Sequence, residues 1–104
     1  MAKYVVYQTE EYNEWFKTQT LKSQRQILHR IAMIETDEHF GHKKHLFNEG
    51  IWELKFNDGR RIYYALVIEQ YKVILLFGGN KNGQNKDIKK ASALYATILK
   101  SRPR

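Results

Sequence analysis

The sequence of 104 residues contains no cysteine, no internal repeat and no long apolar run. Without cysteine the chain has no disulfide, no thiol nucleophile and no cysteine-ligated zinc site, and this composition fits a reducing cytoplasm. No segment approaches the roughly 18 apolar residues of a transmembrane helix. The segment Met1–Tyr4 lacks the apolar core of a signal peptide. We therefore expect a cytoplasmic protein that does not enter a membrane.

Acidic residues are scarce relative to basic ones. The chain has 18 Lys and Arg against 11 Asp and Glu, which gives a net charge of +7. Such an excess attracts an acidic partner or a polyanion, although it can also serve solubility alone. Because the basic residues are spread among aromatic ones, we favour nucleic acid as the partner. The length suits one domain over 1–104, in which 101–104 is expected to be a frayed tail.

The first part of the sequence predicts one strand and two helices. Residues 4–8 are β-branched and aromatic, as in a short strand. Thr9 is a suitable N-cap for a helix with an aromatic face, and Thr20 can cap a second, longer helix. The apolar residues that recur with helical spacing in the second helix are Leu21, Ile27, Leu28, Ile31 and Ile34. Residues 38–48 are polar and are expected to form a loop.

The second part predicts a three-stranded meander followed by a helix. Residues 51–56 and 60–68 alternate in polarity around the turn Asn57-Asp58-Gly59, which is typical of a β-hairpin. A third strand covers 72–77 and is expected to end at Gly78-Gly79, and a helix follows over 84–99. The predicted order is β-α-α-β-β-β-α, an α+β fold. We expect an antiparallel sheet with helices packed on one face and the other face open to solvent.

Four polar side chains are expected to meet on the open face of that sheet. If Trp52 faces the helices, alternation places Glu53 and Lys55 on the opposite face, and Arg61 and Tyr63 join them from the next strand. Cleavage of RNA by its own 2′-hydroxyl needs a proton acceptor, a cationic clamp for the phosphorane and a proton donor. Glu53 or a lysine could accept the proton, and Lys or Arg could form the clamp. The alternative is an exposed face of cross-strand ion pairs.

A glycine-rich segment, residues 78–84, joins the third strand to the last helix. It lacks the Gly-Lys-Ser/Thr end of a Walker loop. Lys81 and the amides at the helix start could hold a phosphate; equally, the segment could be a turn capped by Asn and Gln. Asp87, in the first helical turn, is expected to face the helix dipole.

Three histidines, His39, His42 and His45, invite a metal site, but the sequence argues against one. Their spacing is not that of helical zinc ligands, and Lys43 and Lys44 would repel a cation. We expect neither a metal nor another cofactor. The segment is better interpreted as a basic loop that contacts nucleic acid or the carboxylates of a partner.

Three segments together resemble the RelE/ParE superfamily. They are Gly50-Ile-Trp-Glu-Leu-Lys, Gly59-Arg-Arg-Ile-Tyr-Tyr and Gly78-Gly-Asn-Lys-Asn-Gly-Gln-Asn-Lys-Asp-Ile. They occur in the order and at the spacing of that superfamily, and within the third segment the pattern matches at Lys81, Gln84 and Asp87. More narrowly, they resemble the HigB-like "addiction module killer protein" branch, which is phage-derived and Gp49-like. The predicted order of helices and strands agrees with a RelE-like fold.

The resemblance implies the toxin of a type II toxin–antitoxin system. Its leading interpretation is a ribosome-dependent mRNA endonuclease, or mRNA interferase, that inhibits translation. The expected partners are the ribosome, mRNA and a cognate antitoxin with a HigA-like helix-turn-helix domain, which would form a hetero-oligomer with the toxin. The alternative is a ParE-like inhibitor of DNA gyrase without nuclease chemistry. A basic RNA-binding module is a third interpretation.

The predicted site residues fall into two sets. The catalytic set is Glu53, Lys55, Arg61, Tyr63 and Lys81. The set expected to bind RNA or phosphate is Lys43, Lys44, Arg60, Asn82 and Gln84. Ribosome-dependent relatives often carry a Tyr or His after the last strand for proton transfer, and this sequence has neither before Tyr95. The general acid and base are thus left open, and catalysis could rest on positioning and charge stabilisation.

Overall fold

The computed structural model describes residues 4–37, 43–46, 51–67 and 70–101, and it confirms the α+β class. The elements in chain order are β1 (Val5–Gln8), α1 (Glu10–Lys17), α2 (Leu21–Asp37), β2 (Lys43–Leu46), β3 (Ile51–Lys55), β4 (Arg60–Val67), β5 (Lys72–Asn80), the 3-10 helix η3 (Lys81–Gly83) and α3 (Gln84–Ser101). Strand β2 is an addition to the predicted order. It replaces part of the expected loop at 38–48, whose other residues lie outside those described, as do 102–104 of the expected tail.

The strands form one five-stranded sheet in the order β1-β5-β4-β3-β2. All neighbours are antiparallel except β1 and β5, which are parallel. In the hairpin, Glu53 pairs with Tyr63 and Lys55 pairs with Arg61. The predicted sharing of one face by these four residues is therefore confirmed.

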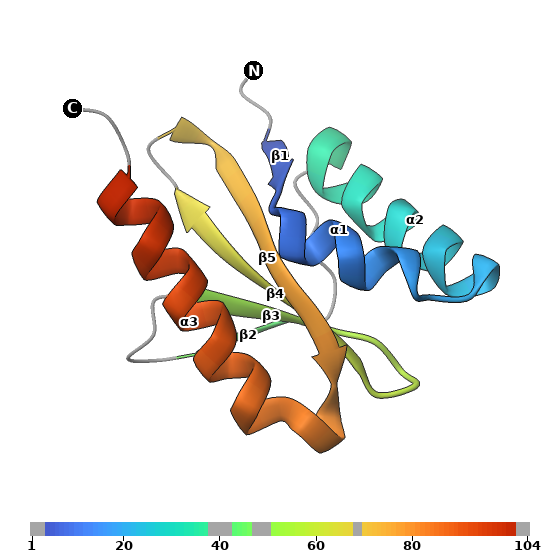
Figure 1. Ribbon diagram of the computed structural model, residues 1–104. Coiled ribbons are helices and arrows are strands. Elements are labelled where there is room, and N and C mark those ends of the chain that lie inside the picture. Colours follow the sequence, from blue (N-terminus) through green and yellow to red (C-terminus); the bar gives the residue numbers. More distant parts are fainter. Residues whose placement is uncertain (1–3, 38–42, 47–50, 68–69, 102–104) are drawn as a thin grey trace.

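Helices cover both faces of the sheet, so the expectation of helices on one face only was wrong. Helices α1 and α2 pack on one face, where Leu54, Ile62 and Tyr64 are buried. Helix α3 packs on the opposite face and buries Tyr63 and Ala65. Figure 1 shows the sheet between α3 on one side and the α1–α2 pair on the other. The physical reason is that both alternating sets of β4 are apolar, and each apolar face needs a cover.

The two predicted helix caps are confirmed, and one of them also joins two elements. The Thr9 hydroxyl accepts a hydrogen bond from the Tyr12 amide (2.9 Å) and donates one to the Leu76 carbonyl of β5 (2.7 Å). The Thr20 hydroxyl accepts a hydrogen bond from the Ser23 amide (3.1 Å). Helix α1 is therefore fixed to the sheet at its N-cap residue.

The apolar stripe of α2 is narrower than predicted. Its isoleucines are buried, whereas Leu21 and Leu28 are 64% and 52% exposed. At about 100° of rotation per residue, these two leucines lie about 100° away from the centre of the isoleucine stripe. They were therefore assigned to the wrong side of the helix.

Two adjacent glycines let both helical layers approach β5. They were expected to end the strand, but β5 continues to Asn80. A Cβ atom at Gly78 would collide with the Trp15 indole of α1, and one at Gly79 would collide with the Asp87 carboxylate of α3. Because consecutive strand residues face opposite sides, the pair provides close contact on both faces at once.

These contacts predict unequal effects of two otherwise identical substitutions. Gly78→Ala is expected to lower the free energy of unfolding by about 1–3 kcal/mol, because the fused indole ring of Trp15 cannot yield without repacking. Gly79→Ala is expected to cost less, because the end of the Asp87 side chain can rotate away. Urea denaturation followed by circular dichroism measures both. Equal losses, or a larger loss for Gly79→Ala, would contradict the packing described here.

Candidate functional site

A buried carboxylate lies at the centre of the face that α3 covers. Glu53 of β3 has no solvent exposure, and among the described residues no other charged side chain is buried so completely. The side-chain amide nitrogen of Gln84 donates hydrogen bonds to both carboxylate oxygens of Glu53, at 2.9 and 2.7 Å. The Arg61 Nε atom lies 3.1 Å from Oε2. A carboxylate in such a place needs these partners, because burial without them costs several kcal/mol.

Local structure in three segments brings these partners together. The β3–β4 register pairs Glu53 with Tyr63, and Arg61 lies two residues before Tyr63 on the same face. The Asn80 side chain caps η3 by accepting from the Asn82 amide (2.9 Å), and the Lys81 amide donates to the Gly59 carbonyl (2.8 Å). The start of α3 is thereby fixed against the hairpin turn. Gln84, its first residue, can then reach Glu53.

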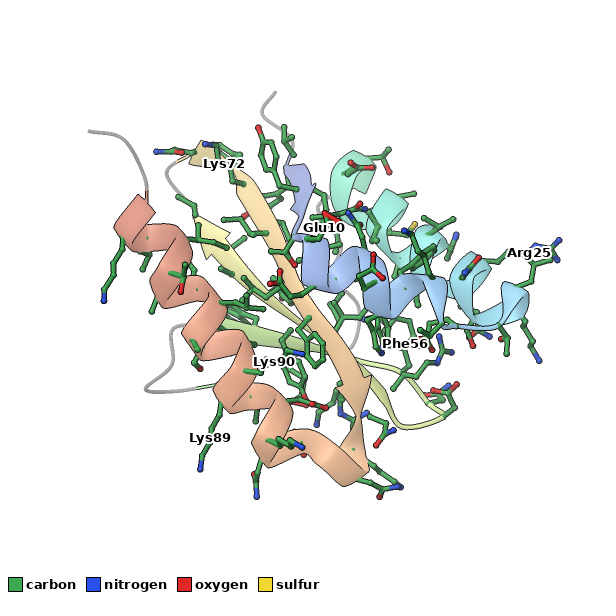
Figure 2. All side chains as sticks on the ribbon, viewed as in Figure 1. Glu10, Arg25, Phe56, Lys72, Lys89 and Lys90 are labelled. Carbon is green, nitrogen blue, oxygen red and sulfur yellow. The ribbon has the colours of Figure 1, made fainter. Side chains whose placement is uncertain are left out.

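Tyr63 and Asp87 complete this polar cluster. Burial raises the pKa of the Tyr63 phenol, and the nearby carboxylates of Glu53 and Asp87 raise it further. Its hydroxyl has no hydrogen-bond partner within the described parts of the chain. Burial also raises the pKa of Asp87, against the opposing charges of Lys90 and Lys86. In Figure 2, Lys90 turns towards the sheet, where it lies 4.0 Å from the centre of the Phe77 ring.

Arg61 is the cation of the cluster, and like Gln84 and Asp87 it is only partly buried. Its side chain is 14% exposed, and its Nη1 atom donates to the Arg60 carbonyl (3.0 Å). The close approach to Glu53 and the hydrogen bond to the Arg60 carbonyl together hold the guanidinium group in place. A guanidinium held in this way is well suited to two-point recognition of a phosphate or carboxylate.

Three cations converge at one end of the sheet. Lys55 ends β3, Arg61 lies at the start of β4, and Lys81 follows the end of β5. The aliphatic part of the exposed Lys81 side chain packs over Gly59 in the hairpin turn. Gly59 has φ of 96°, a left-handed conformation that favours glycine. The turn therefore positions Lys81 close to the other two cations.

The remaining predicted residues are distributed differently. Arg60 turns to the opposite face, where its Nε atom lies 2.7 Å from Asp58 and its guanidinium contacts Gln26. The Gln84 amide is engaged with Glu53, an intramolecular role that sequence reasoning missed. Asn82 is exposed in η3. Lys43 and Lys44 belong to the edge strand β2, opposite Leu54 and Glu53 respectively, rather than to a loop.

Two further features bear on the class of site. No group of three or more His, Asp or Glu side chains that could hold a metal occurs among the described residues, and His39 and His42 lie outside them. None of the helices that the structure describes is long and apolar enough to cross a membrane.

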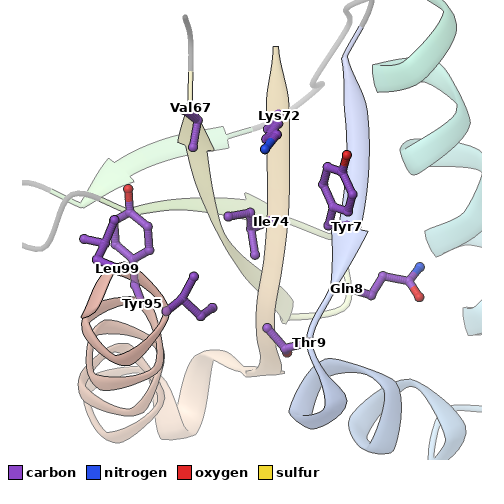
Figure 3. Close-up of a pocket in the computed structure, with 9 residues that line it drawn as sticks. Tyr7, Gln8, Thr9, Val67, Lys72, Ile74, Tyr95 and Leu99 are labelled. Carbon is purple, nitrogen blue, oxygen red and sulfur yellow. The ribbon is translucent and has the colours of Figure 1, made fainter. Parts of the chain in front are cut away.

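An apolar pocket of about 440 Å³ lies away from the cluster, between the end of α3 and strands β1 and β5. Figure 3 shows Tyr7, Ile74, Tyr95 and Leu99 around it, with Lys72 at one side. The Lys72 ammonium lies 5.6 Å from the centre of the Tyr7 ring. None of the predicted catalytic or phosphate-binding residues lines this pocket.

Fold and topology are those of RelE toxins. A mutant of the Escherichia coli toxin RelE in the free state is similar over 88% of this chain and 96% of that chain, with a TM-score of 0.67 and 14% identity. The toxin–antitoxin complex RelBE2 of Mycobacterium tuberculosis matches over 76% and 99%, with a TM-score of 0.64 and 16% identity. The intact E. coli RelBE complex matches over 74% and 95%, with a TM-score of 0.63 and 14% identity.

The chain belongs to the family described as "Phage derived protein Gp49-like (DUF891)", which matches residues 14–97. An uncharacterized protein of Haemophilus influenzae is 34% identical over 87 residues, which cover 80% of this chain and 84% of that protein. The predicted resemblance to a phage-derived, Gp49-like family is thereby confirmed, and the fold shared with RelE toxins agrees with the predicted RelE-like fold.

Proposed function

We propose that this protein is the toxin of a type II toxin–antitoxin system and that it cleaves mRNA on the ribosome. The observation that carries the proposal is the convergence of Lys55, Arg61 and Lys81 at one end of the sheet, with Arg61 oriented by a buried carboxylate. Among the solved structures that share its fold are RelE toxins, two of them in complex with their antitoxins.

The cations would bind the scissile phosphate and stabilise its transition state. The 2′-oxygen attacks phosphorus, its proton passes to a base, and the bond to the 5′-oxygen breaks as that oxygen gains a proton. The products are a 2′,3′-cyclic phosphate and a 5′-hydroxyl end. Arg61 would hold two phosphate oxygens, while Lys55 and Lys81 would offset the charge of the phosphorane. Oriented charges of this kind commonly supply the largest part of a rate enhancement.

Burial limits which residues of the predicted catalytic set can accept or donate a proton. Glu53 and Tyr63 have no solvent exposure, and Gln84 covers both oxygens of Glu53. We therefore assign Glu53 as a positioning residue that orients Arg61. Because its pKa is raised, Tyr63 keeps its proton at neutral pH and could only donate. The remaining proton acceptors in the predicted set are Lys55, which is half-buried, and Lys81, which is exposed. The lysine that acts as base would take the proton in its neutral form and would then carry the charge that offsets the phosphorane.

The proposal includes a partner and a location. The partner is a cognate antitoxin with a HigA-like helix-turn-helix domain, and the two chains would form a hetero-oligomer. An antitoxin segment that covers Arg61 would need acidic residues to match the local positive charge. The site of action is the cytoplasm, where the ribosomes are.

Inducible expression in a bacterium tests the proposal. Uptake of labelled amino acid and labelled thymidine is followed after induction. We expect protein synthesis to stop first, because cleaved messages cannot be translated, and we expect mapping of mRNA ends to show new internal 5′-hydroxyl termini. Intact mRNA together with unchanged protein synthesis would refute the assignment as a nuclease.

A second candidate is a ParE-like inhibitor of DNA gyrase that performs no chemistry. The observation in its favour is the burial of Glu53 and Tyr63, which leaves neither acidic group of the predicted catalytic set at the surface. It requires DNA synthesis to stop before protein synthesis in the same experiment.

A further inference from the structure

A cleft of about 490 Å³ lies on the face of the sheet opposite the Glu53 cluster, between α2 and the β3–β4 turn. Basic residues line it from both sides. Lys22, His29 and Arg30 come from α2, and Phe56, Asp58 and Arg60 come from the end of β3, the turn and the start of β4. Phe56 belongs to the packing of the α1–α2 face, so most of this cleft lies apart from the cluster beneath α3, although Lys55 also lines it.

A phenylalanine ring stacked with two guanidinium groups forms one wall of the cleft. The guanidinium carbons of Arg30 and Arg60 lie 4.6 and 4.8 Å from the centre of the Phe56 ring. Both arginines are held in place: Arg30 donates to the Lys55 carbonyl (2.9 Å), and Arg60 pairs with Asp58. Because these groups are already ordered, a ligand would lose little conformational entropy when it binds them.

The charge of the cleft is strongly positive. Asp58 is the one acidic residue among those that line it, and Arg60 already neutralises it. Lys22 and His29 are exposed on α2 at the same cleft. The excess of cations suits a phosphate group, and the flat surface of aromatic and guanidinium groups beside it suits a nucleic-acid base.

We propose that this cleft binds one nucleotide of a single-stranded RNA. Lys22 and Arg60 would contact the phosphate, and the base would stack at the Phe56–arginine wall. The volume lies within the range of small-ligand pockets and suits a nucleotide. The inference rests on the proposed function in taking RNA as the ligand, and it adds a contact surface that the cleavage site does not require.

The position of the cleft allows one RNA strand to contact both faces of the protein. Arg60 faces the cleft and Arg61 faces the Glu53 cluster, and the two are consecutive residues of β4. The β3–β4 turn lies between the two regions, and the Lys81 side chain packs against Gly59 of this turn. A strand anchored in the cleft would therefore continue around the hairpin towards Arg61. Apart from Lys55, which also belongs to the proposed clamp, the residues of the cleft would raise affinity without taking part in chemistry.

Equilibrium binding to a labelled 2′-O-methyl oligoribonucleotide tests this inference. The probe lacks the 2′-hydroxyl nucleophile, so cleavage cannot disturb the measurement. Fluorescence anisotropy of the full chain is recorded at several salt concentrations. The test variant is Lys22→Gln, and the control is Lys89→Gln. Lys89 is also an exposed helical lysine, but it projects from α3 away from the sheet (Figure 2).

Loss of one phosphate contact has a defined signature. Lys22→Gln is expected to reduce the slope of log affinity against log salt by about 0.7 and the affinity by about fivefold at about 0.1 M salt, and Lys89→Gln to change neither. Arg60→Gln should lower the slope similarly if thermal unfolding shows that it folds. Equal effects of Lys22→Gln and Lys89→Gln would overturn the inference. So would a cleft that binds a labelled acidic peptide but not the RNA probe.

The two proposals fail in different ways. If the wild-type chain binds the probe and Lys22→Gln matches the control, only the cleft is refuted. If Lys22→Gln weakens binding as expected while expression leaves mRNA intact, only the nuclease is refuted.

Discussion

Arg61→Ala is expected to abolish the arrest of protein synthesis that the wild-type chain causes. The substitution removes the one guanidinium that Glu53 orients at the surface, and with it the two-point contact to the phosphate. Removal of a comparable charge-stabilising donor lowers a catalytic rate by about a hundredfold to a thousandfold. The measurement is uptake of labelled amino acid after induction, compared with the wild type at equal protein level.

The result must be separated from loss of folding, because Arg61→Ala also leaves Glu53 without its ion pair. Thermal unfolding and circular dichroism report whether the variant is folded. Arg61→Lys retains a charge near Glu53 but not the planar fork, and we expect it to fold normally with partial activity. Lys89→Ala, on the exposed side of α3, should keep full toxicity. A folded Arg61→Ala variant with wild-type toxicity would exclude Arg61 from the clamp.

Glu53→Ala is expected to be the most destabilising substitution in the site. It leaves the Arg61 charge without its buried partner and removes both acceptors of the Gln84 amide. Breaking a buried pair in this way costs about 3–5 kcal/mol of the free energy of unfolding. Chemical denaturation of Glu53→Ala, Arg61→Ala and the double variant measures it, and the double variant should lose less than the sum of the two singles. Additive losses would show that the pair is not coupled.

Glu53→Gln separates positioning from proton transfer. This variant keeps the size of the side chain and one acceptor for Gln84, and it removes the charge. If Glu53 only orients Arg61, cleavage is weakened but its pH profile is unchanged. Loss of the acidic limb of the profile would identify Glu53 as the base and would mean that Gln84 moves during the reaction.

The local elements of this fold could be predicted because their signals are local. Thr9 and Thr20 start helices, and Asp58-Gly59 between alternating strands forms a hairpin. Those signals also placed Glu53, Lys55, Arg61 and Tyr63 on one face, since that depends only on alternation and on the register of a short turn. The resemblance of three segments to the RelE/ParE superfamily agreed with the order of helices and strands that these signals predict.

Contacts between distant segments could not be predicted in the same way. The Glu53–Gln84 contact joins residues 31 positions apart and depends on where α3 lies. Tyr63 and Ala65 were not recognised as a second apolar face, so Glu53 was expected at an open surface and is buried instead. β2 was missed because its sequence, Lys-Lys-His-Leu, lacks the apolar and β-branched residues that mark strands. This segment pairs with β3 because β3 would otherwise be the edge strand of the sheet, with unpaired backbone groups.

The Gly78-Gly79 pair also limits how this fold can be recombined. Each glycine accommodates a specific side chain from a different helix, Trp15 from α1 and Asp87 from α3. A larger residue at Gly78 would require a smaller one at Trp15, and a larger residue at Gly79 would require the Asp87 side chain to move or to be replaced. A chimera that takes β5 from a relative must therefore take α1 and α3 from the same source, which makes these three segments one exchangeable unit although α1 and α3 lie far apart in the sequence.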